Sequence, residues 1–272
     1  MITLDELKRL SGQLSVDVTV LEKDYCLGWF LKGLSENSVL HENLAFKGAT
    51  AIKKTYFPDY RFSEDLDFTS KKDFTEAILE REVQAVCNEL TSASGINYSL
   101  VRVENKRDAK GETAWELRIE FIGPRGQAQS PRRIRLDITA FEKILKPLKK
   151  RQINHPYSDQ FKAAINTYAL EEILAEKLRT ILQRGYPRDI YDVWFVLKYG
   201  RVNGNVLREL FFRKCAYKKI AFQSVDTLLE KIEASHIRAH WEASLARQLT
   251  NLPDLLIVRA DLARTLRGIL PS

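Results

Sequence analysis

The stretch RFSEDLDFT, residues 61–69, alternates between polar and apolar residues. Because successive side chains of a β-strand point to opposite faces, Leu66 and Phe68 share one face, and Asp65 and Asp67 share the other. The apolar face fixes the register of such a strand within a sheet. The stretch therefore predicts a half-buried strand that presents two aspartates together on its polar face.

The residues on both sides of this stretch predict further strands and helices. From the N-terminus onward they predict a helix over 16–35, a strand over 44–47, a helix over 49–56, a helix from a Ser70–Asp73 cap to about Leu90, a hairpin of strands over 96–103 and 113–122 around a turn at 105–111, a strand over 132–141, and helices almost throughout after Pro156.

This order of elements predicts a mixed α/β (α+β) fold. N-terminal helices and a small mixed β-sheet are expected over residues 1–145, and a mainly helical domain over residues 146–272. The break between the two domains is expected near residues 147–156, where prolines interrupt the pattern.

Composition excludes several classes of protein. No apolar run approaches the roughly 18 residues that a membrane span needs, and the N-terminal segment lacks the apolar stretch of a signal peptide. The three cysteines are odd in number and scattered, which excludes a disulfide framework and is typical of a reducing cytoplasm. We therefore expect a cytoplasmic protein without a membrane partner.

The paired aspartates are the strongest chemical signal in the sequence. Two carboxylates this close repel each other unless a cation lies between them, and magnesium prefers oxygen ligands. Asp137 lies on the polar face of a later predicted strand, beside Arg133 and Arg135. If that strand neighbours the first, three carboxylates converge as a two-metal site requires. The alternatives are a solvated strand face for the pair and a salt bridge to an arginine for Asp137.

Two other segments carry candidate phosphate-binding groups. The turn Lys47-Gly48-Ala49-Thr50 joins a predicted strand to a predicted helix, and the first free amides of a helix attract anions. No P-loop or Rossmann glycine pattern is present. Lys177 falls inside the apolar stripe of a predicted helix over 170–184, so it must reach solvent or pair with an anion.

The next helix is expected to begin near Pro187, a favourable first-turn residue. Asp189 suits the first turn because it complements the helix dipole. Asp192 lies deeper among apolar residues and needs a cationic partner, for which Lys177 is the natural candidate.

Three segments together resemble a known family: LAFKGATAI from residue 44, RFSEDLDF from residue 61, and ALEEILAEKLRTILQRGYPRDIYDVW over residues 169–194. They are similar, in the same order, to the AbiEii/AbiGii nucleotidyltransferase toxins. These are the toxins of bacterial abortive-infection and related toxin–antitoxin systems, within the DNA polymerase β-like superfamily. Ala49 departs from the second glycine or serine that the family usually has.

The resemblance implies roles for individual residues. Ser63 and Asp65 would belong to the metal and triphosphate site, with Asp67 as a second metal ligand. Lys177 would contact the nucleotide phosphates, and Asp192 would be the acidic residue that follows it on the next helix. Lys47, Gly48 and Thr50 are expected to bind nucleotide, and Asp137 to complete the metal site with Asp65 and Asp67.

The expected activity is therefore Mg²⁺- or Mn²⁺-dependent transfer of a nucleoside monophosphate from a nucleoside triphosphate (NTP) to an RNA. Family members act on the acceptor end of tRNA, and a cognate antitoxin is a possible protein partner. Two alternatives stay open: a nucleotidyltransferase that modifies a protein or small molecule, and a non-catalytic protein that binds RNA or an antitoxin.

Charge distribution favours the RNA acceptor. Residues 146–272 carry 22 basic and 13 acidic side chains, and an excess of this kind is typical of a polyanion-binding region. The basic residues expected to contact RNA form two clusters, Lys146, Lys149, Lys150 and Arg151 in one and Arg213, Lys214, Lys218 and Lys219 in the other. Phe211, Phe212 and Tyr217 are interleaved with the second cluster and could stack on bases.

Overall fold

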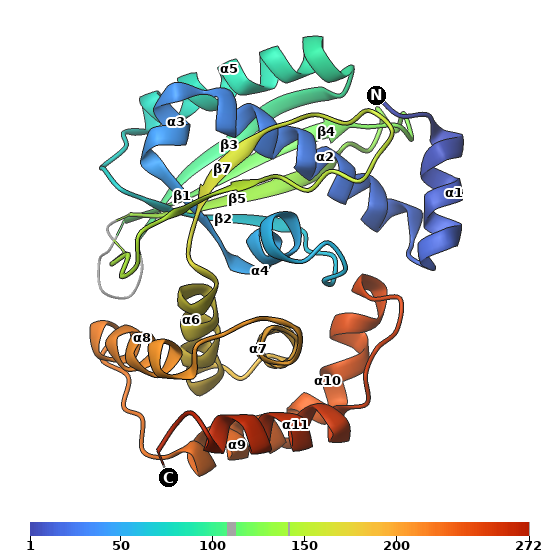
Figure 1. Cartoon of the computed structure of the whole chain (residues 1–272). Coiled ribbons are helices and arrows are strands. Elements are labelled where there is room, and N and C mark those ends of the chain that lie inside the picture. The colour runs from blue at the N-terminus through green and yellow to red at the C-terminus, as the bar shows by residue number, and fades with distance from the viewer. Residues whose placement is uncertain (108–112, 141, 272) are drawn as a thin grey trace. The chain divides into compact units, whose positions relative to one another are not determined.

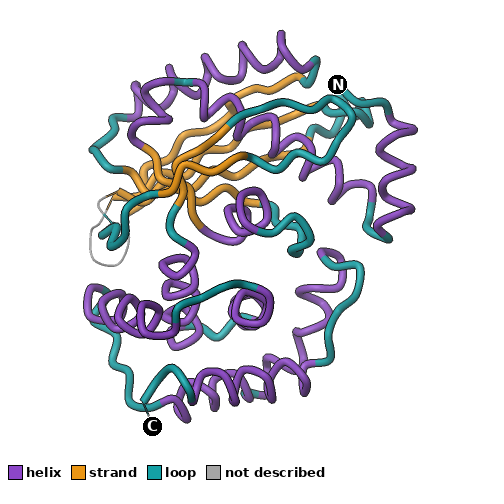
Figure 2. The backbone as a smooth tube through the Cα atoms, in the orientation of Figure 1, coloured by secondary structure: helices purple, strands orange, loops and turns teal. Residues whose placement is uncertain are grey.

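The computed structural model describes residues 1–107, 113–140 and 142–271. These residues form two compact units, unit 1 over Met1–Tyr168 and unit 2 over Ala169–Ser272. The described strands all belong to unit 1, and unit 2 consists of helices and loops (Figures 1 and 2). The predicted mixed α/β fold, with a sheet followed by helices, is confirmed.

Unit 1 is built on a seven-stranded mixed sheet with the strand order β3-β4-β5-β2-β1-β7-β6. Its strands are β1 (Leu44–Lys47), β2 (Asp65–Ser70), β3 (Asn97–Arg107), β4 (Thr113–Ile122), β5 (Arg132–Ala140), β6 (Lys149–Gln152) and β7 (Ala164–Thr167). Two neighbouring pairs are parallel, β2 with β5 and β1 with β7, and the other pairs are antiparallel.

Helices cover the apolar face of this sheet. The helical elements of unit 1 are α1 (Leu4–Leu14), α2 (Val18–Glu36), α3 (Ser38–Asn43), α4 (Gly48–Ala51), the π-helical turn η1 (Ile52–Tyr56) and α5 (Glu76–Ser94). Figure 1 shows α2, α3 and α5 along one side of the sheet. Leu66 and Phe68 of β2 and Leu136 and Ile138 of β5 are buried, as the predicted alternation requires.

The helix predicted over residues 16–35 is α2, but it is buried on nearly every side. Its Asp24 is buried together with Lys54, whose ammonium group donates to the Asp24 carboxylate over 2.7 Å. Tyr157 donates a second hydrogen bond to the same carboxylate. A charged residue is tolerated inside the unit because it is paired and hydrogen-bonded.

Several boundaries differ from the predicted ones. Residues 61–64 are not part of the sheet, and β2 begins at Asp65. Thr75, not Ser70, caps the following helix, because Ser70 is the last residue of β2 and its hydroxyl bonds to the carbonyl of Lys72. Most of the predicted 105–111 turn, and Phe141 at the predicted end of β5, lie outside the described residues.

Two short strands lie where the sequence predicts the domain break and the first helices: β6 within residues 147–156, and β7 after Pro156. β6 and β7 pair with each other, and Phe46 of β1 pairs with Thr167 of β7. Because this pairing attaches residues 149–167 to the sheet, unit 1 extends to Tyr168 instead of ending near residue 145. The basic residues of 146–151 therefore belong to unit 1.

Unit 2 begins with the helix that contains Lys177. Its helical elements are α6 (Leu170–Gln183), α7 (Pro187–Tyr199), α8 (Gly204–Tyr217), α9 (Val225–Glu233), α10 (Ser235–Leu245), the 3₁₀ turn η2 (Ala246–Gln248) and α11 (Leu255–Arg267). The predicted start of α7 at Pro187 is confirmed.

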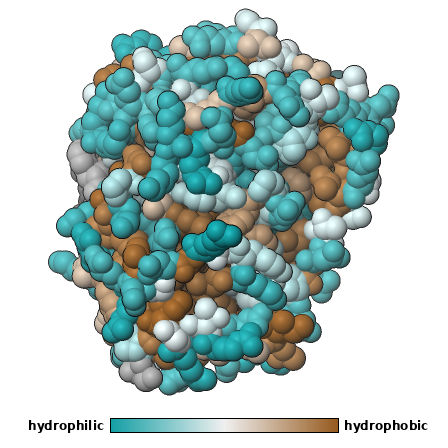
Figure 3. Space-filling model, viewed as in Figure 1, coloured by the Kyte–Doolittle hydropathy of each residue, from teal (hydrophilic) through white to brown (hydrophobic). Residues whose placement is uncertain are grey.

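On the face shown in Figure 3, hydrophilic and hydrophobic residues are intermixed.

Within the described residues, every helix is too short or too polar to cross a membrane.

Gly28 allows α2 to approach a buried ring. A Cβ atom at this position would lie 2.5 Å from Nδ1 of His155, and the His155 side chain is itself buried against Phe161. We predict that Gly28→Ala lowers the free energy of unfolding by about 1–3 kcal/mol through overpacking. The measurement is urea unfolding followed by circular dichroism.

Gly12→Ala is the matched control. Gly12 is also helical, but a Cβ atom there would meet nothing within 4 Å. This substitution should stabilise the chain by about 0.5–1 kcal/mol, because alanine favours a helix more than glycine does. Equal stabilities of Gly28→Ala and the wild type would contradict the assigned close approach.

Candidate active site

The parallel pairing of β2 with β5 brings the predicted carboxylates together. Asp67 lies directly opposite Asp137, and Asp65 lies directly opposite Arg135. Paired residues share one face of a sheet, so these four side chains form a compact group on the polar face of unit 1. The two strands are neighbours, which is the condition under which the sequence predicts that the three carboxylates converge.

Arg135 lies between two of the three carboxylates. Its Nη2 atom is 2.9 Å from Oδ2 of Asp65, and its Nε atom is 3.1 Å from Oδ2 of Asp137. The salt bridge between Asp137 and an arginine, which was the alternative interpretation of Asp137, is therefore present. This contact does not exclude a metal-binding role, because the Arg135 side chain is about half exposed and long enough to move aside.

The carboxylates influence one another electrostatically. Burial raises the pKa of Asp137 to about 6, Arg135 opposes this shift, and the negative charges of Asp67 and Asp65 add to it. A cation placed among these oxygens would remove the repulsion.

The group also fits a hard divalent ion by the chemistry of its donors. Within the described residues, no three acidic, histidine or cysteine side chains are arranged so that they could hold a metal ion by themselves. Magnesium at nucleotide sites needs only one or two carboxylates together with phosphate oxygens and water. Asp65 and Asp67 on one strand, with Asp137 opposite, provide that number of oxygen ligands.

Gly48 is required by the position of Asp67. Gly48 adopts a φ of +78°, and a Cβ atom there would lie 2.3 Å from Oδ2 of Asp67. Thr50 is buried, and its hydroxyl donates to the backbone carbonyl of Asp65. These two residues of the predicted phosphate-binding turn thus shape the carboxylate group directly.

The other two residues predicted to bind nucleotide have different surroundings. Lys47 forms a short ion pair with Glu142, and its ammonium group lies 5.8 Å from the centre of the Tyr168 ring. Ser63 is partly buried in the segment that precedes β2. Glu142 was not identified from the sequence, because it follows β5 and is not part of the alternating polar and apolar pattern that marks a strand.

In unit 2, Lys177 has the partner that the sequence predicts. Its Nζ atom is 2.9 Å from Oδ2 of Asp192 and 2.9 Å from Oδ1 of Asp189. Both aspartates are buried, and Arg184 also contacts Asp189 over 3.1 Å. Burial opposes ionisation of Asp189, but the charges of Lys177 and Arg184 outweigh it and hold its pKa below the ordinary value.

The ammonium group of Lys177 is consequently held in one place by two carboxylates. Asp189 does more than complement the helix dipole, because it forms half of this clamp. Arg184 was not identified from the sequence. It is the last residue of the predicted 170–184 helix, whereas α6 ends at Gln183 and Arg184 follows it as the C-cap.

One predicted RNA-binding cluster is partly wrong. Lys214 is buried, and its Nζ atom pairs with Glu172 and Glu176 of α6, each over 2.8 Å. Phe211 is also fully buried. Neither side chain is available to RNA, because Lys214 pairs with α6 and the Phe211 ring packs against Phe222.

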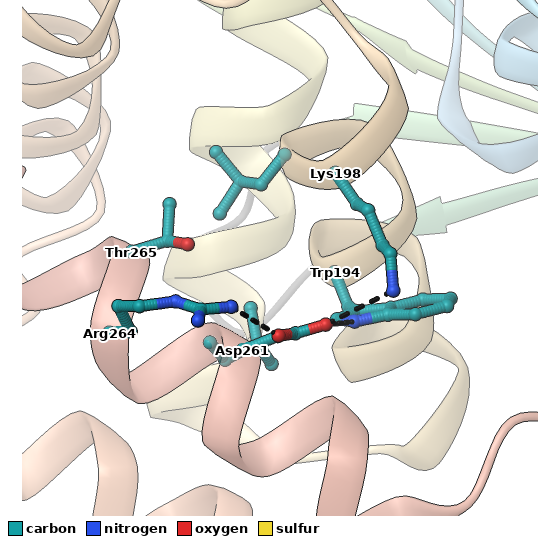
Figure 4. Close-up of a pocket in the computed structure, with 7 residues that line it drawn as sticks. Trp194, Lys198, Asp261, Arg264 and Thr265 are labelled. Atoms are coloured by element: carbon teal, nitrogen blue, oxygen red, sulfur yellow. Dashed lines mark hydrogen bonds and ion pairs between the residues drawn. The ribbon is translucent and has the colours of Figure 1, made fainter.

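A pocket of about 270 Å³ is lined by residues of α7 and α11. Figure 4 shows these residues, among them Trp194, Lys198 and Asp261. Asp261 accepts hydrogen bonds from Trp194 and Lys198 over 3.1 and 3.2 Å, and it also pairs with Arg264. These contacts tie α11 to the helix that carries Asp189 and Asp192.

Comparisons with solved structures support the fold. The chain is similar to MenT4, a nucleotidyltransferase toxin from Mycobacterium tuberculosis H37Rv, with a TM-score of 0.71 and 17% identity over 99% of this chain and 90% of that chain. It is also similar to JHP933 from Helicobacter pylori, with a TM-score of 0.55 and 18% identity over 93% of both chains. A comparison with curated proteins found no match.

The sequence profile of the family described as "Nucleotidyl transferase AbiEii toxin, Type IV TA system" matches residues 29–267. The match includes the carboxylate-bearing strands of unit 1 and the Lys177 clamp of unit 2. The chain belongs to the AbiEii nucleotidyltransferase toxin family, whose members are toxins of type IV toxin–antitoxin systems.

Proposed function

We propose that this nucleotidyltransferase moves a nucleoside monophosphate from an NTP to a hydroxyl of an RNA, and that the RNA is a tRNA at its 3′ end. The observation that carries the proposal is the grouping of Asp65, Asp67 and Asp137 on one face of the sheet. A protein that only binds RNA or an antitoxin would have no use for three mutually repelling carboxylates.

In the proposed reaction Asp65 and Asp67 would hold Mg²⁺ or Mn²⁺, and Asp137 would complete the site. When bound, the ion would supply Lewis acidity toward the phosphates and lower the pKa of the attacking hydroxyl. As the hydroxyl loses its proton to solvent, a bond from its oxygen to the α-phosphorus forms, and the bond from that phosphorus to pyrophosphate breaks.

Residues around the carboxylates assist by positioning. Gly48 leaves space for Asp67, and Thr50 fixes the backbone of Asp65. Their backbone amides, together with Ser63 and Lys47, are proposed to contact the triphosphate. Lys177 is proposed to neutralise charge on the phosphates, with Asp192 holding its ammonium group in place.

The partners follow from this reaction. The proposed substrates are an NTP and an RNA. These substrates, and the free, buried cysteines of the described residues, support the proposal of a cytoplasmic protein. As a member of a toxin–antitoxin family, the chain is proposed to be counteracted by a cognate antitoxin.

The basic edge of the sheet is the best candidate for RNA contact. Lys149 and Lys150 are exposed on the edge strand β6. Burial lowers the pKa of His41, and the nearby charges of Lys150 and Lys71 lower it further. Two lysines from separate segments therefore contribute positive charge near His41. Arg151 differs, since its Nε donates to the carbonyl of Thr55 and its guanidinium group lies over the Tyr56 ring.

The first prediction concerns the metal ligands. Asp65→Asn and Asp67→Asn should each reduce pyrophosphate release from NTP and RNA by about 100-fold or more, because each removes a ligand charge worth several kcal/mol in the transition state. Asp73→Asn, an exposed aspartate beyond β2, is the control and should retain activity. Full activity in the Asp65→Asn/Asp67→Asn double variant would refute the assignment.

The second prediction concerns toxicity. Expression of the wild-type chain should arrest bacterial growth, and Lys177→Met and Asp192→Asn should relieve the arrest at equal soluble protein level, because the clamped ammonium group is lost or misplaced. Lys198→Met removes a lysine from α7 outside the clamp and should leave the arrest intact. Arrest by all three variants alike would mean that toxicity does not depend on Lys177.

The third prediction concerns RNA binding. Affinity for tRNA should fall log-linearly with salt, because phosphate contacts release counterions. Lys149→Gln/Lys150→Gln should flatten the slope by about 0.7–0.9 for each lost contact. Arg151 is kept, because it holds Thr55 and Tyr56.

The control for this titration is Lys8→Gln/Arg9→Gln, which removes the same charge from exposed positions of α1. It should leave the slope as in the wild type. Identical slopes for both double variants would place the acceptor elsewhere. A wild type insensitive to salt would favour a protein or small-molecule acceptor.

A further inference from the structure

Arg135 occupies the position in the carboxylate group where a cation is expected. Its guanidinium group contacts Asp65 over 2.9 Å and Asp137 over 3.1 Å, and Asp67 lies opposite Asp137 in the same register. One positive side chain is therefore set among three negative ones. Arg135 lies on β5, two residues before Asp137. The sheet therefore fixes its backbone as firmly as it fixes the backbone of Asp137.

The charge of Arg135 is permanent. Burial works against it, but the surrounding carboxylates, Asp65 first among them, raise its pKa above the ordinary value for arginine. A divalent ion and a guanidinium group cannot share the space between Asp65 and Asp137 without strong repulsion. Metal binding thus requires Arg135 to release at least one carboxylate.

Arg135 has the chemistry to find a new partner after that release. Its side chain is about half exposed, so it can turn toward solvent without breaking a packed core. A guanidinium fork matches phosphate oxygens in a bidentate manner. In the proposed reaction, the triphosphate that accompanies the metal places such oxygens beside the carboxylates.

We propose that Arg135 holds the place of the metal in the free protein and binds the triphosphate once the metal–nucleotide complex arrives. This inference rests on the proposed function. It means that free metal binds weakly, because it must displace a guanidinium group, whereas metal and nucleotide together bind tightly. Arg135 is then the residue that couples the two ligands, and the coupling is reciprocal.

The neighbouring arginine on the same face provides a matched control. Arg133 lies two residues before Arg135 on β5, but its guanidinium group pairs with Glu120 of β4 over 2.8 Å. Glu120 is not among the three proposed metal ligands. Removing Arg133 therefore changes the charge of the same sheet face without changing the contacts of Asp65 or Asp137.

The experiment measures binding, not turnover. Mn²⁺ affinity of the full chain is determined by electron paramagnetic resonance, alone and with each of the four α,β-methylene nucleoside triphosphates, whose α–β bridge cannot be cleaved. Arg135→Gln should bind free Mn²⁺ about 3–10-fold more tightly than the wild type. It should bind nucleotide in the presence of Mn²⁺ about 10-fold more weakly, which reduces the coupling between the ligands toward none.

Two further variants make the outcome decisive. Arg135→Lys keeps the charge but not the fork, so it should resemble the wild type for free Mn²⁺ and resemble Arg135→Gln for nucleotide. Arg133→Gln should match the wild type in both measurements. If Arg135→Gln also matches the wild type, or binds Mn²⁺ more tightly with unchanged nucleotide affinity, the proposed role of Arg135 is overturned.

Failure of the proposed function gives a different result. In that case the wild type binds no more Mn²⁺ than the Asp65→Asn/Asp67→Asn variant, with or without nucleotide. Carboxylate-dependent Mn²⁺ binding that is insensitive to Arg135 would instead retain the metal site and reject only the inference about the arginine.

Discussion

The parallel pairing of β2 with β5 is the constraint on which the rest of unit 1 depends. It sets Asp67 opposite Asp137 and Asp65 opposite Arg135. The charged side chains of the two strands therefore lie close together on one face of the sheet. The pairing is held by the buried face, where Leu66 and others pack under the helices. Because a shift of one residue would exchange the two faces, the same apolar contacts that stabilise the fold also fix the site.

Charges inside both units are arranged as paired groups. Lys54 with Asp24 in unit 1, and Lys214 with Glu172 in unit 2, are buried pairs that link helices to other elements. Removing one member of such a pair leaves an uncompensated buried charge, which is strongly destabilising. The Lys177 clamp is built in the same way, but 16% of the Lys177 side chain is exposed, compared with 1% for Lys214. The proposed contact of Lys177 with phosphates requires this exposure.

Alternation and helical periodicity predict much of this arrangement because they report which face is buried. They identified β2, the carboxylates and the Lys177–Asp192 pair. They missed β6 and β7, whose short sequences KKRQ and AINT become strands through pairing with distant residues. The clustering of basic residues wrongly predicted that Lys214 is exposed to RNA. Its two glutamate partners lie on another helix, so the sequence around Lys214 does not reveal that it is buried. Long-range partners such as Glu142 leave no local pattern.

The proposed transfer of a nucleoside monophosphate to RNA can be measured directly. The full chain is incubated with total RNA, Mg²⁺ and each NTP, labelled at either the α- or the γ-phosphate. We expect α-label from one nucleotide to appear in small RNAs of tRNA size and γ-label to stay out of RNA, because pyrophosphate leaves. Transfer of γ-label, or α-label that stays out of RNA with every nucleotide, would refute the proposed transfer.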